Sequence, residues 1–504
     1  MNKFLQKAIS AIAVCAAATL TAPAQINDLP RATPEETGIP SQALCTLLDS
    51  LTALPGTEMH SVVVARHGKV VAEIYPAPIK PEYKHTLYSC SKTFVGAAVG
   101  LAIDDGLLSI NDNLVSFFPD KLPKTISPQL AAITIENLLT MTSGIEPDWT
   151  LRNLTTEWVA SMLAKEVKDP GQTFRYDSMC SYLLSAIVQR ATGMTLLDYL
   201  KTKIFEPMGI TDIEWEISPE GYNTGGWGLY AQPEALAKFG ILLNHSGLWD
   251  GKQLIPADWV AQMTTSKVKT NTLDYCYHTW LADYPGSSRA DGALGQYILM
   301  HPATDLVVVI TECTTGNGIR QRELVWETLM PVMSDTPLPP SDDTATLRHK
   351  EASYTLPTPQ GNMHSDNETD MNGRQFDLEG NRLEWASIGF DFHDSTLLAT
   401  ITLDCGDTVR VECGYQNWLT AQTASYPIYS LRPIGRFTGI TPPFHVAGSY
   451  AWDDNGTLLM RVQYADWVTA VDASVTFTSD ESLTLTAQEN YAKAPVTIKG
   501  TAPR

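Results

Sequence analysis

The chain has 504 residues, more than one ordinary hydrophobic core accommodates, so we expect at least two domains. Hydrophobic residues make up 44% and charged residues 18%, which is typical of a globular protein and excludes a largely disordered one. The formal net charge of −21 at pH 7 disfavours nucleic acid and anionic lipid as partners, because an acidic surface repels both.

The N-terminal segment has the layout of a secretory signal peptide. Lys3 and Lys7 precede an alanine-rich apolar run over 8–20, and the small-residue pattern Ala22-Pro23-Ala24 follows it. We therefore expect a signal peptide over 1–24 and a periplasmic or secreted mature protein. The run is too short to remain as a membrane span after cleavage, since a span needs about 18 apolar residues or more.

The eight cysteines do not form a metal or redox motif. Cys15 lies in the apolar N-terminal run, where lipid attachment is an alternative that the bulky Val14 disfavours. The other cysteines are scattered without a Cys-x-x-Cys pair, and their odd number excludes complete pairing. Cys405 and Cys413 are the nearest pair, and a disulfide between them stays open. We expect no metal site and no cofactor.

Strand and helix patterns follow one another along residues 25–333. Strands are predicted at 61–66, 69–75, 296–300 and 306–311, and helices at 89–105, 157–164, 181–191, 233–243 and 323–333. His67-Gly68 predicts a hairpin between the first two strands. Because strands lie at both ends and helices between them, we expect one sheet built from both ends and covered by helices.

The pattern changes in the Pro- and Asp-rich stretch at 334–345, which predicts a linker. Short alternating runs follow at 375–378, 382–386, 396–403, 408–413, 458–464, 473–478 and 482–487. They predict an all-β domain over 346–504. Whether this domain caps a cleft, binds cell-wall or glycan polymer, or dimerises stays open.

Ser89-Cys90-Ser91-Lys92 is the most informative local motif. Ser-x-x-Lys spacing places both side chains on one helix face, with the serine at the helix N-terminus, where backbone N–H groups favour negative charge. Residues 94–103 are apolar nearly all round, so Lys92 is expected to be buried, with a lowered pKa, and able to accept the Ser89 proton. An N-cap serine beside a solvent-reaching lysine is the alternative. A second match, 266–269, lies in a polar stretch and predicts a surface loop.

Tyr176 ends a loop that begins at Pro170-Gly171 and leads into another predicted helix. If it lies near Lys92, the ammonium would lower the phenol pKa from about 10 and allow Tyr176 to act as general base and acid. A tyrosine that simply packs in a loop is the alternative.

These motifs resemble the serine β-lactamase and penicillin-binding-protein superfamily, in the class C-like branch of β-lactamases, D-alanyl-D-alanine peptidases, esterases and oligoamide hydrolases. The resemblance covers residues 35–333 and includes, in order, Ser89-Cys90-Ser91-Lys92, Leu138-Leu139-Thr140-Met141-Thr142-Ser143-Gly144, Pro170-Gly171 through Tyr176-Asp177-Ser178, Gly225-Gly226-Trp227-Gly228-Leu229 with Ala237-Lys238-Phe239-Gly240, and Asp291-Gly292-Ala293-Leu294-Gly295-Gln296. It implies an α+β or α/β fold, a β-lactamase/transpeptidase-like domain with an antiparallel sheet covered by helices.

The resemblance also implies a role for each matching residue. Ser89 corresponds to the acylated nucleophile, Lys92 to its proton acceptor, and Tyr176 to the group that passes the proton to the leaving group and then activates water. The backbone N–H groups of Ser89 and Ala293 would form the oxyanion hole, where one donor contributes about 3–4 kcal/mol. Substrate contacts are expected from Ser178, Asp291 and Gly292, and from Gly225 and Gly226, for which a plain turn is the alternative. Trp149, Trp227 and Trp280 are candidates to line the cleft, with ordinary core or rim packing as the alternative.

Two departures from the family pattern bear on the substrate. Ser178 replaces the asparagine of Tyr-x-Asn, and Ala290-Asp291-Gly292 replaces Lys-Thr-Gly, whose lysine helps β-lactamases to bind the substrate carboxylate. We therefore predict a serine hydrolase that acts through an acyl-enzyme on an ester, an amide or a D-amino-acid peptide bond of a small-molecule or peptide substrate. The alternatives are a true β-lactamase and an inactive member that serves as a cell-envelope binding module.

Overall fold

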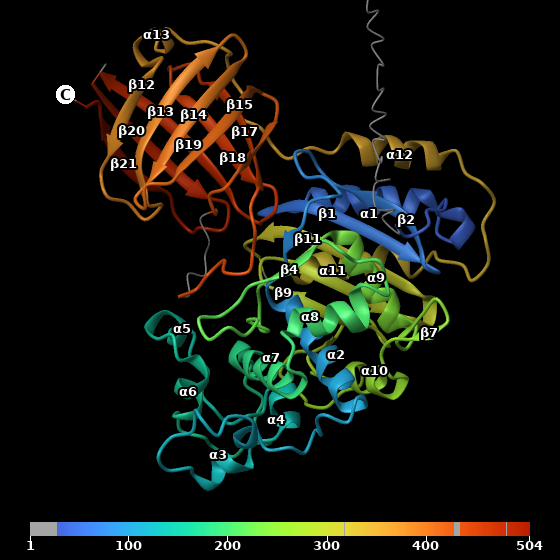
Figure 1. Cartoon of the computed structure of the whole chain (residues 1–504). Helices are drawn as coiled ribbons and strands as arrows, with labels where there is room; N and C mark the ends of the chain where they lie inside the picture. Colours follow the sequence, from blue (N-terminus) through green and yellow to red (C-terminus); the bar gives the residue numbers. More distant parts are fainter. Residues whose placement is uncertain (1–27, 317, 428–433, 480, 504) are drawn as a thin grey trace, which may run out of the picture.

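The computed structural model describes residues 28–316, 318–427, 434–479 and 481–503, and these ranges form two units (Figure 1). The predicted signal peptide and the alternative lipid site at Cys15 lie outside the described residues. The first unit is a sheet with helices on both faces, and the second is a β-barrel, orange and red in Figure 1. Among the described residues, no helix combines the length and the hydropathy needed to cross a bilayer.

Most helices of the first unit lie, in sequence, between the strands near its start (57–74) and the strands near its end (280–314). The helices are α1 (Ser41–Thr52), α2 (Ser91–Asp104), α3 (Pro128–Ala132), α4 (Ile135–Leu139), α5 (Leu151–Leu154), α6 (Trp158–Leu163), α7 (Ser178–Thr192), α8 (Leu196–Leu200), α9 (Pro233–Asn244), α10 (Ala257–Thr264), α11 (Ile319–Leu329) and α12 (Asp343–Ser353). Short 3₁₀ turns cover Glu35–Thr37, Tyr88–Cys90, Leu114–Phe117 and Pro302–Thr304, and a π-helical turn covers Lys201–Phe205.

The central sheet is antiparallel and combines strands from both ends of the first unit, which confirms the prediction. In spatial order its strands are β2 (Lys69–Ile74), β1 (Thr57–Arg66), β11 (Leu306–Thr314), β10 (Gln296–His301), β9 (Ser288–Gly292) and β8 (Trp280–Leu281). A smaller sheet joins β3 (His85–Thr86), β5 (Leu229–Ala231) and β4 (Ile213–Trp215), and β6 (Leu248–Trp249) pairs with β7 (Lys252–Gln253).

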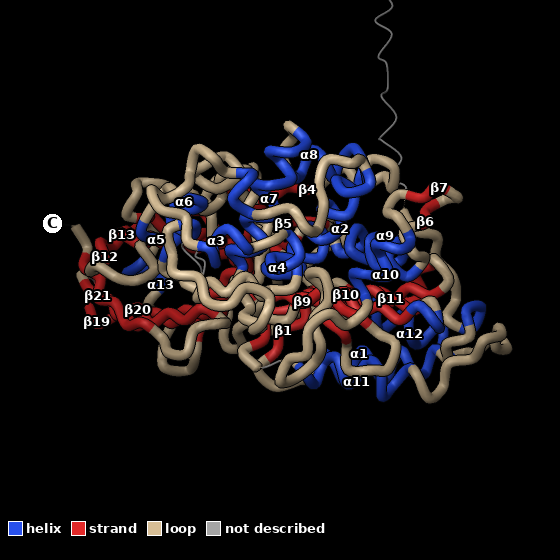
Figure 2. Tube along the Cα trace, turned by 90° about the horizontal axis from the view of Figure 1, so that it is seen from below, coloured by secondary structure: helices blue, strands red, loops and turns tan. Residues whose placement is uncertain are grey.

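Both faces of the central sheet are covered, which explains why β1 and β11 are apolar without alternation. Val63 and Val309 join the cluster that contains α2 and α9, whereas Val62 and Val308 join the cluster that contains α1 and α11. Figure 2 shows these two helical layers on opposite sides of the strands. Successive side chains of a strand point to opposite faces, so each face receives its own half of the run.

Helix α12 departs from the prediction. Residues 334–345 were expected to be a linker and 346 the start of the all-β domain, but α12 begins at Asp343 and packs on the first unit. Leu347 is buried with α1, and Lys350 Nζ lies 2.7 Å from the Asp49 carboxylate. The polar sequence of α12 has no apolar stripe, so its helicity depends on these tertiary contacts.

The second unit is a closed barrel that carries the short helix α13 (Glu368–Met371). Its strands are β12 (Arg374–Leu378), β13 (Trp385–His393), β14 (Thr396–Leu403), β15 (Thr408–Tyr415), β16 (Leu419–Thr423), β17 (Phe444–Trp452), β18 (Leu458–Tyr464), β19 (Ala470–Ser479), β20 (Ser482–Glu489) and β21 (Val496–Thr501). The order within the described residues is β15-β14-β13-β12-β21-β20-β19-β18-β17-β16, and a parallel pairing of β15 with β17 closes the barrel. Strands β16, β17 and β21 were not predicted.

Alternate residues of the barrel strands point inward and form one hydrophobic cluster. Val409, Val411 and Cys413 of β15 are buried, while the residues between them are exposed. Cys413 pairs in register with Leu397, whereas Cys405 is exposed in the turn at the other end of the same hairpin. Both are free thiols, so the disulfide that the sequence left open is not formed.

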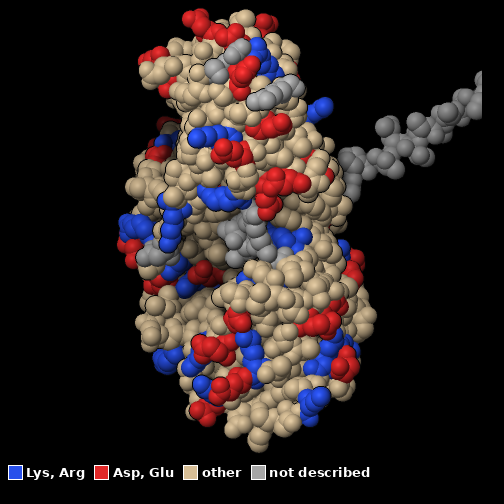
Figure 3. All heavy atoms as spheres, turned by 90° about the vertical axis from the view of Figure 1, so that its left-hand side faces the viewer, with Lys and Arg blue, Asp and Glu red and all other residues tan. Residues whose placement is uncertain are grey.

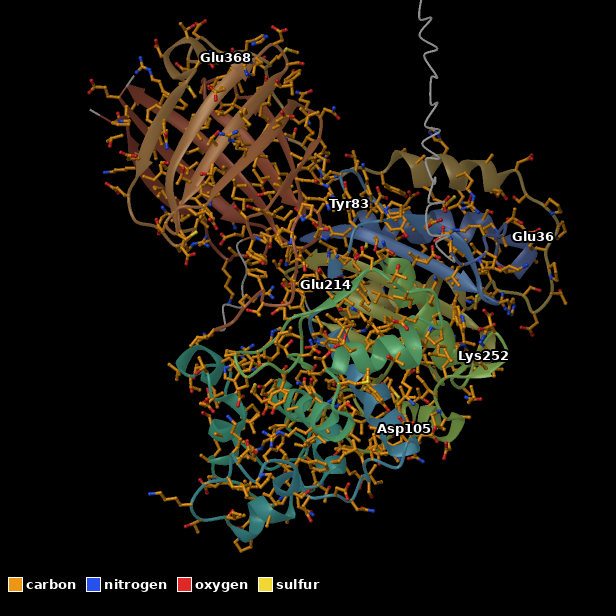
Figure 4. All side chains as sticks on the ribbon, in the orientation of Figure 1. Glu36, Tyr83, Asp105, Glu214, Lys252 and Glu368 are labelled. Atoms are coloured by element: carbon orange, nitrogen blue, oxygen red, sulfur yellow. The ribbon has the colours of Figure 1, made fainter. Side chains whose placement is uncertain are left out.

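The two units meet along β3, β4 and β5. In Figure 4 the labelled residues Tyr83 and Glu214 lie close to the junction with the barrel. The ring of Tyr83 stacks on His445 with centroids 3.8 Å apart, and a Glu214 carboxylate oxygen accepts a 3.1 Å hydrogen bond from the backbone N–H of Thr441. The barrel therefore touches the segment that leads directly to Ser89.

Candidate active site

Ser89 lies in the 3₁₀ turn Tyr88–Cys90, two residues before the first residue of α2. The sequence predicted a helix from residue 89, and the difference arises from Tyr88, whose φ of 47° is in the left-handed region. That conformation costs roughly 1–2 kcal/mol for a residue with a Cβ. Packing around the turn therefore holds Ser89 in place.

Lys92 lies one turn further along and is almost completely buried, with 1% of its surface exposed. Its Nζ contacts three oxygens: Ser89 Oγ at 2.8 Å, Ser178 Oγ at 2.8 Å and the Gly226 carbonyl at 2.6 Å. Contacts with Ser178 and Gly226, which lie far from Lys92 in the sequence, thus hold the amine against Ser89. The surface-reaching lysine considered as an alternative is excluded by this geometry.

Burial lowers the pKa of Lys92 from 10.5 to about 7, an effect that the nearby Asp177 carboxyl opposes in part. Desolvation penalises the charged form of a buried amine, which is why the shift is downward. A large fraction of Lys92 is therefore neutral near pH 7, with a lone pair available to the Ser89 hydroxyl 2.8 Å away.

Tyr176 completes the group, because its ring lies 4.8 Å below Lys92 Nζ and its phenol forms a hydrogen bond with Ser89. Burial raises the pKa of the Tyr176 phenol above its usual range, and the Ser89 hydrogen bond offsets only part of that effect. The predicted lowering of this pKa by Lys92 is wrong, because desolvation of the buried phenolate outweighs the favourable contacts around it. Tyr176 carries its proton at neutral pH.

Ser178 is the first residue of α7, and its neighbour Asp177 caps that helix through a 2.9 Å hydrogen bond to the Met179 N–H. Ser178 lines the pocket and also contacts Lys92. A position expected to orient substrate therefore also holds the lysine. The adjoining Gly225-Gly226 segment is packed against α7, where a Cβ at Gly226 would lie 2.4 Å from the Ser178 carbonyl oxygen.

The end of β9 brings Asp291, Gly292 and Ala293 next to the turn Tyr88–Cys90, which carries Ser89. A Cβ on Gly292 would lie 2.4 Å from the carbonyl oxygen of Leu87, so only glycine permits this approach. Ala293 lines the same pocket as Ser89, and its carbonyl accepts a 3.3 Å hydrogen bond from Gln296. This placement leaves the predicted oxyanion donors, the N–H groups of Ser89 and Ala293, on neighbouring segments.

Ser89, Tyr176, Ser178, Asp291 and Ala293 line one pocket of about 650 Å³, and Lys92 contacts it through Ser89 and Ser178. Its lining residues are Tyr88, Ser89, Trp149, Tyr176, Ser178, Gly226, Trp227, Thr272, Leu273, Trp280, Asp283, Arg289, Asp291, Ala293, Ile319 and Arg322. All three expected tryptophans are among them, whereas Gly225 and Gly292 are not and only adjoin lining residues in the sequence. Trp149 is 43% exposed at the mouth, whereas Trp227 is buried.

Two arginines of the pocket were missed by sequence analysis. Arg289 pairs with Asp291 at 2.8 Å, and Arg322 pairs with Asp283 at 2.7 Å. Each arginine thus faces a carboxylate, and the charges in the pocket compensate one another. The Arg289-x-Asp291 spacing on one strand, which places both side chains on the same face, was the available sequence signal.

Other titratable groups do not extend the site. Among the described residues no group of three or more His, Cys, Asp and Glu side chains is arranged to hold a metal ion. The second Ser-x-x-Lys match lies at the surface, where Ser266 bonds Asp274 and the Lys269 side chain is 88% exposed. On the face shown in Figure 3, acidic and basic side chains are interspersed, so no single-sign patch steers the substrate there.

Comparisons with known proteins agree on one family. Residues 48–327 match the profile of the Beta-lactamase family. The 6-aminohexanoate-dimer hydrolase of Paenarthrobacter ureafaciens is 23% identical over 308 residues, which cover 55% of this chain and 79% of that protein. Penicillin-binding protein 4* of Bacillus subtilis is 28% identical over 167 residues, which cover 30% of this chain and 35% of that protein.

Solved structures agree on the fold. A penicillin-binding-protein homologue from Caulobacter crescentus aligns with a TM-score of 0.50 at 18% identity, covering 60% of this chain and 100% of that chain. A putative beta-lactamase from Bacteroides dorei aligns with a TM-score of 0.50 at 16% identity, covering 57% of this chain and 98% of that chain. At these identities the likeness concerns the fold alone.

Proposed function

This chain belongs to the Beta-lactamase family, and on that basis we propose that it is a serine hydrolase that works through an acyl-enzyme formed on Ser89. The observation that carries the proposal is the 2.8 Å contact between Lys92 Nζ and Ser89 Oγ, made by a buried lysine with a pKa of about 7. A nucleophile and a base in hydrogen-bond contact, with the base near neutrality, are what acyl transfer from a serine requires.

Acylation begins when neutral Lys92 accepts the Ser89 proton and Oγ attacks the substrate carbonyl. The resulting oxyanion is bound by the N–H groups of Ser89 and Ala293. The C–N or C–O bond to the leaving group then breaks, and the proton passes from Lys92 through the Tyr176 phenol to the leaving group. Deacylation runs the same proton path in reverse order, with water in place of the leaving group.

The pocket favours a substrate with little net charge and apolar groups beside the scissile bond. Trp149, Trp280 and Ile319 supply apolar surface, and both pocket arginines are already paired with aspartates. Ala290 stands where a β-lactamase has the carboxylate-binding lysine. We therefore propose esters and linear amides as substrates, and the relative named for hydrolysis of the 6-aminohexanoate dimer supports the amide.

We further propose that the protein works outside the cytoplasm, in the periplasm or as a secreted enzyme. The proposal depends on the basic, apolar and small-residue pattern of residues 1–24.

A substrate panel tests the function directly. We expect wild type to hydrolyse a p-nitrophenyl acyl ester and a linear acyl p-nitroanilide, and to act far more slowly on nitrocefin and on a D-alanyl-D-alanine peptide. Ser89→Ala should lower turnover at least about 10³-fold, because it removes the nucleophile. Ser266→Ala, in the second Ser-x-x-Lys match, is the matched control and should leave turnover unchanged.

The panel also separates the alternatives. Nitrocefin as the fastest substrate would identify a β-lactamase instead. No Ser89-dependent turnover of any substrate would favour an inactive binding module and overturn the hydrolase.

A further inference from the structure

Tyr88, the residue before Ser89, lines the pocket and also packs in the hydrophobic cluster that the barrel shares with the adjoining part of the first unit. Its side chain is buried and belongs to that cluster, not to the two clusters that cover the central sheet. Tyr230 of β5 lies in the same cluster. Because Tyr88 directly precedes Ser89 and has the unusual φ of 47°, contacts that fix Tyr88 also fix the nucleophile turn.

Two barrel-unit side chains hold the Tyr230 hydroxyl. Trp467, in the turn between β18 and β19, donates from Nε1 at 3.0 Å, and Arg436, between β16 and β17, donates at 2.8 Å. The hydroxyl in turn donates to Glu216 at 3.0 Å, and Arg436 forms an ion pair with the same carboxylate. All of these groups are buried, and a buried hydrogen-bond network fixes the positions of its members.

From Tyr230 the connection to the nucleophile turn is short and continuous. Its neighbour Leu229 donates a backbone hydrogen bond to Ser91 Oγ at 3.1 Å, and that hydroxyl donates to the Tyr88 carbonyl at 2.6 Å. The backbone of Leu87 donates to Leu229 O at 3.0 Å. Strand β5 and the turn that carries Ser89 are thus tied together on both sides of Tyr88.

Two backbone contacts reinforce the connection. Thr86 N–H donates to the carbonyl of Asp466, the residue before Trp467, at 3.2 Å. Ile434 N–H donates to Arg152 O at 3.0 Å, and the Arg152 guanidinium lies 4.7 Å from the ring of the pocket residue Trp227. The barrel therefore supports both the nucleophile turn and one wall of the pocket.

We propose that the C-terminal barrel is a positioning element of the active site, and that Trp467 and Arg436 hold Ser89 in its reactive orientation through Tyr230 and Tyr88. The inference depends on the proposed role of Ser89 as nucleophile. It assigns a task in the hydrolase itself to the barrel, which sequence alone left open between capping, glycan binding and dimerisation. Small errors in the position of a nucleophile lower the rate of the chemical step more than they lower substrate binding.

Trp467→Phe tests the proposal in the full-length protein, because it keeps an aromatic ring and removes the donor to Tyr230, and the loss of ring volume is the same in the control below. Trp452→Phe is the matched control, since Trp452 is a buried barrel tryptophan whose Nε1 donates to Glu368 at 3.0 Å. We measure kcat and KM for a p-nitrophenyl ester and the rate of Ser89 phosphonylation by a fluorophosphonate. Trp467→Phe should lower kcat and the phosphonylation rate about tenfold, with KM changed less than about twofold.

Tyr230→Phe supplies a second variant on the other side of the contact. It should lower kcat at least as much as Trp467→Phe does, because it removes the hydrogen bonds with Trp467, Arg436 and Glu216 together. The double variant should lose no more than Tyr230→Phe alone, because that change already removes the bond from Trp467. Trp452→Phe should match wild type.

The outcomes distinguish the two proposals. Wild-type protein that phosphonylates on Ser89, with unchanged rates in folded Trp467→Phe and Tyr230→Phe, would overturn the positioning role alone. Equal losses in Trp467→Phe and Trp452→Phe would overturn it as well, because the loss would then reflect general destabilisation of the barrel. Wild-type protein that does not react at Ser89 would overturn the proposed function, and the positioning role with it.

Discussion

The two units bury ionisable side chains in different settings. The barrel core consists mainly of aliphatic and aromatic side chains, with alternate strand residues pointing inward, as in β15 and β20. The buried ionisable residues Arg461, Asp466 and Glu489 of the barrel unit each lie in an ion pair, whereas the first unit also buries Lys92, His60, His85, His278 and Glu312. An apolar core needs only the right pattern and volume, whereas a buried ionisable group needs specific partners.

The pKa values of the buried groups distinguish the histidines, which stay neutral, from Lys92, which can exchange a proton near pH 7. Burial lowers the pKa of His60, His85 and His278 to about 3, so these rings are neutral at pH 7. It lowers the pKa of Lys92 only to about 7, which leaves the lysine able to gain and lose a proton under ordinary conditions. That single group is the one in contact with Ser89.

The largest expected effect of a single substitution is on activity, in the first unit. Lys92→Met removes the proton acceptor of Ser89 and should lower kcat/KM for a p-nitrophenyl ester by about 10³-fold or more. Circular dichroism should show a folded protein. The matched control is Lys269→Met, in the second Ser-x-x-Lys match, which should keep wild-type kinetics; similar kinetics for both variants would contradict the assignment of Lys92.

A substitution in the barrel core outside the contacts to Tyr230 should lower stability and leave kcat nearly unchanged. Leu485→Ala removes a fully buried side chain of β20 and should reduce the free energy of unfolding by about 2–5 kcal/mol, measured by urea titration. Below the unfolding transition, kcat should stay within about twofold of wild type. A large loss of kcat without a loss of stability would mean that this part of the barrel also acts on the site.

Acidification should weaken the first unit before the barrel. The pKa values of His60, His85 and His278 lie below the unfolded value of 6.5, so their contribution to stability is complete above pH 6.5 and decreases as the pH falls towards 3. Each histidine contributes a slope of at most about 1.4 kcal/mol per pH unit. Hydrogen exchange at pH 4.5 should increase in β1 and around residue 278 relative to β13–β15; uniform or barrel-first exchange would contradict the comparison.

The smallest effect is expected at the free thiols of the barrel. Cys405→Ser should change the free energy of unfolding by less than about 0.5 kcal/mol, because Cys405 is an exposed turn residue without a disulfide. Added reductant should leave the melting temperature of wild type unchanged. A melting temperature that falls in reductant would show that Cys405 and Cys413 are bonded after all.

Strands and helices with a periodic pattern of apolar residues could be predicted from the sequence. Alternation predicted β14, β15, β18 and β20 because their inner faces are apolar, and the apolar run at 306–311 predicted a doubly covered strand. Helix α12 was missed because Leu347 is its one buried residue and its other contacts with the first unit are polar, so the helix leaves no periodic apolar signal.

Within the site, the order of motifs predicted that Ser89, Lys92 and Tyr176 lie together. The structure brings them into contact beside one pocket, which Ser89 and Tyr176 line. The left-handed φ of Tyr88 and the raised pKa of Tyr176 could not be predicted from the sequence, because packing from other elements determines both. Arg289 was missed although its spacing from Asp291 was a signal, because that spacing is informative only once residues 288–292 are known to form strand β9.

The central claim is that neutral Lys92 activates Ser89, and the pH dependence of covalent labelling tests it most directly. Wild-type protein is treated with a fluorophosphonate between pH 5 and 9, and the adduct is counted by intact mass and located by peptide mapping. We predict one adduct per chain, on Ser89, with a rate that rises through an apparent pKa near 7 as Lys92 loses its proton, and that is lost in Lys92→Met. An adduct on another residue, or equally fast labelling of Ser89 in Lys92→Met, would contradict the account.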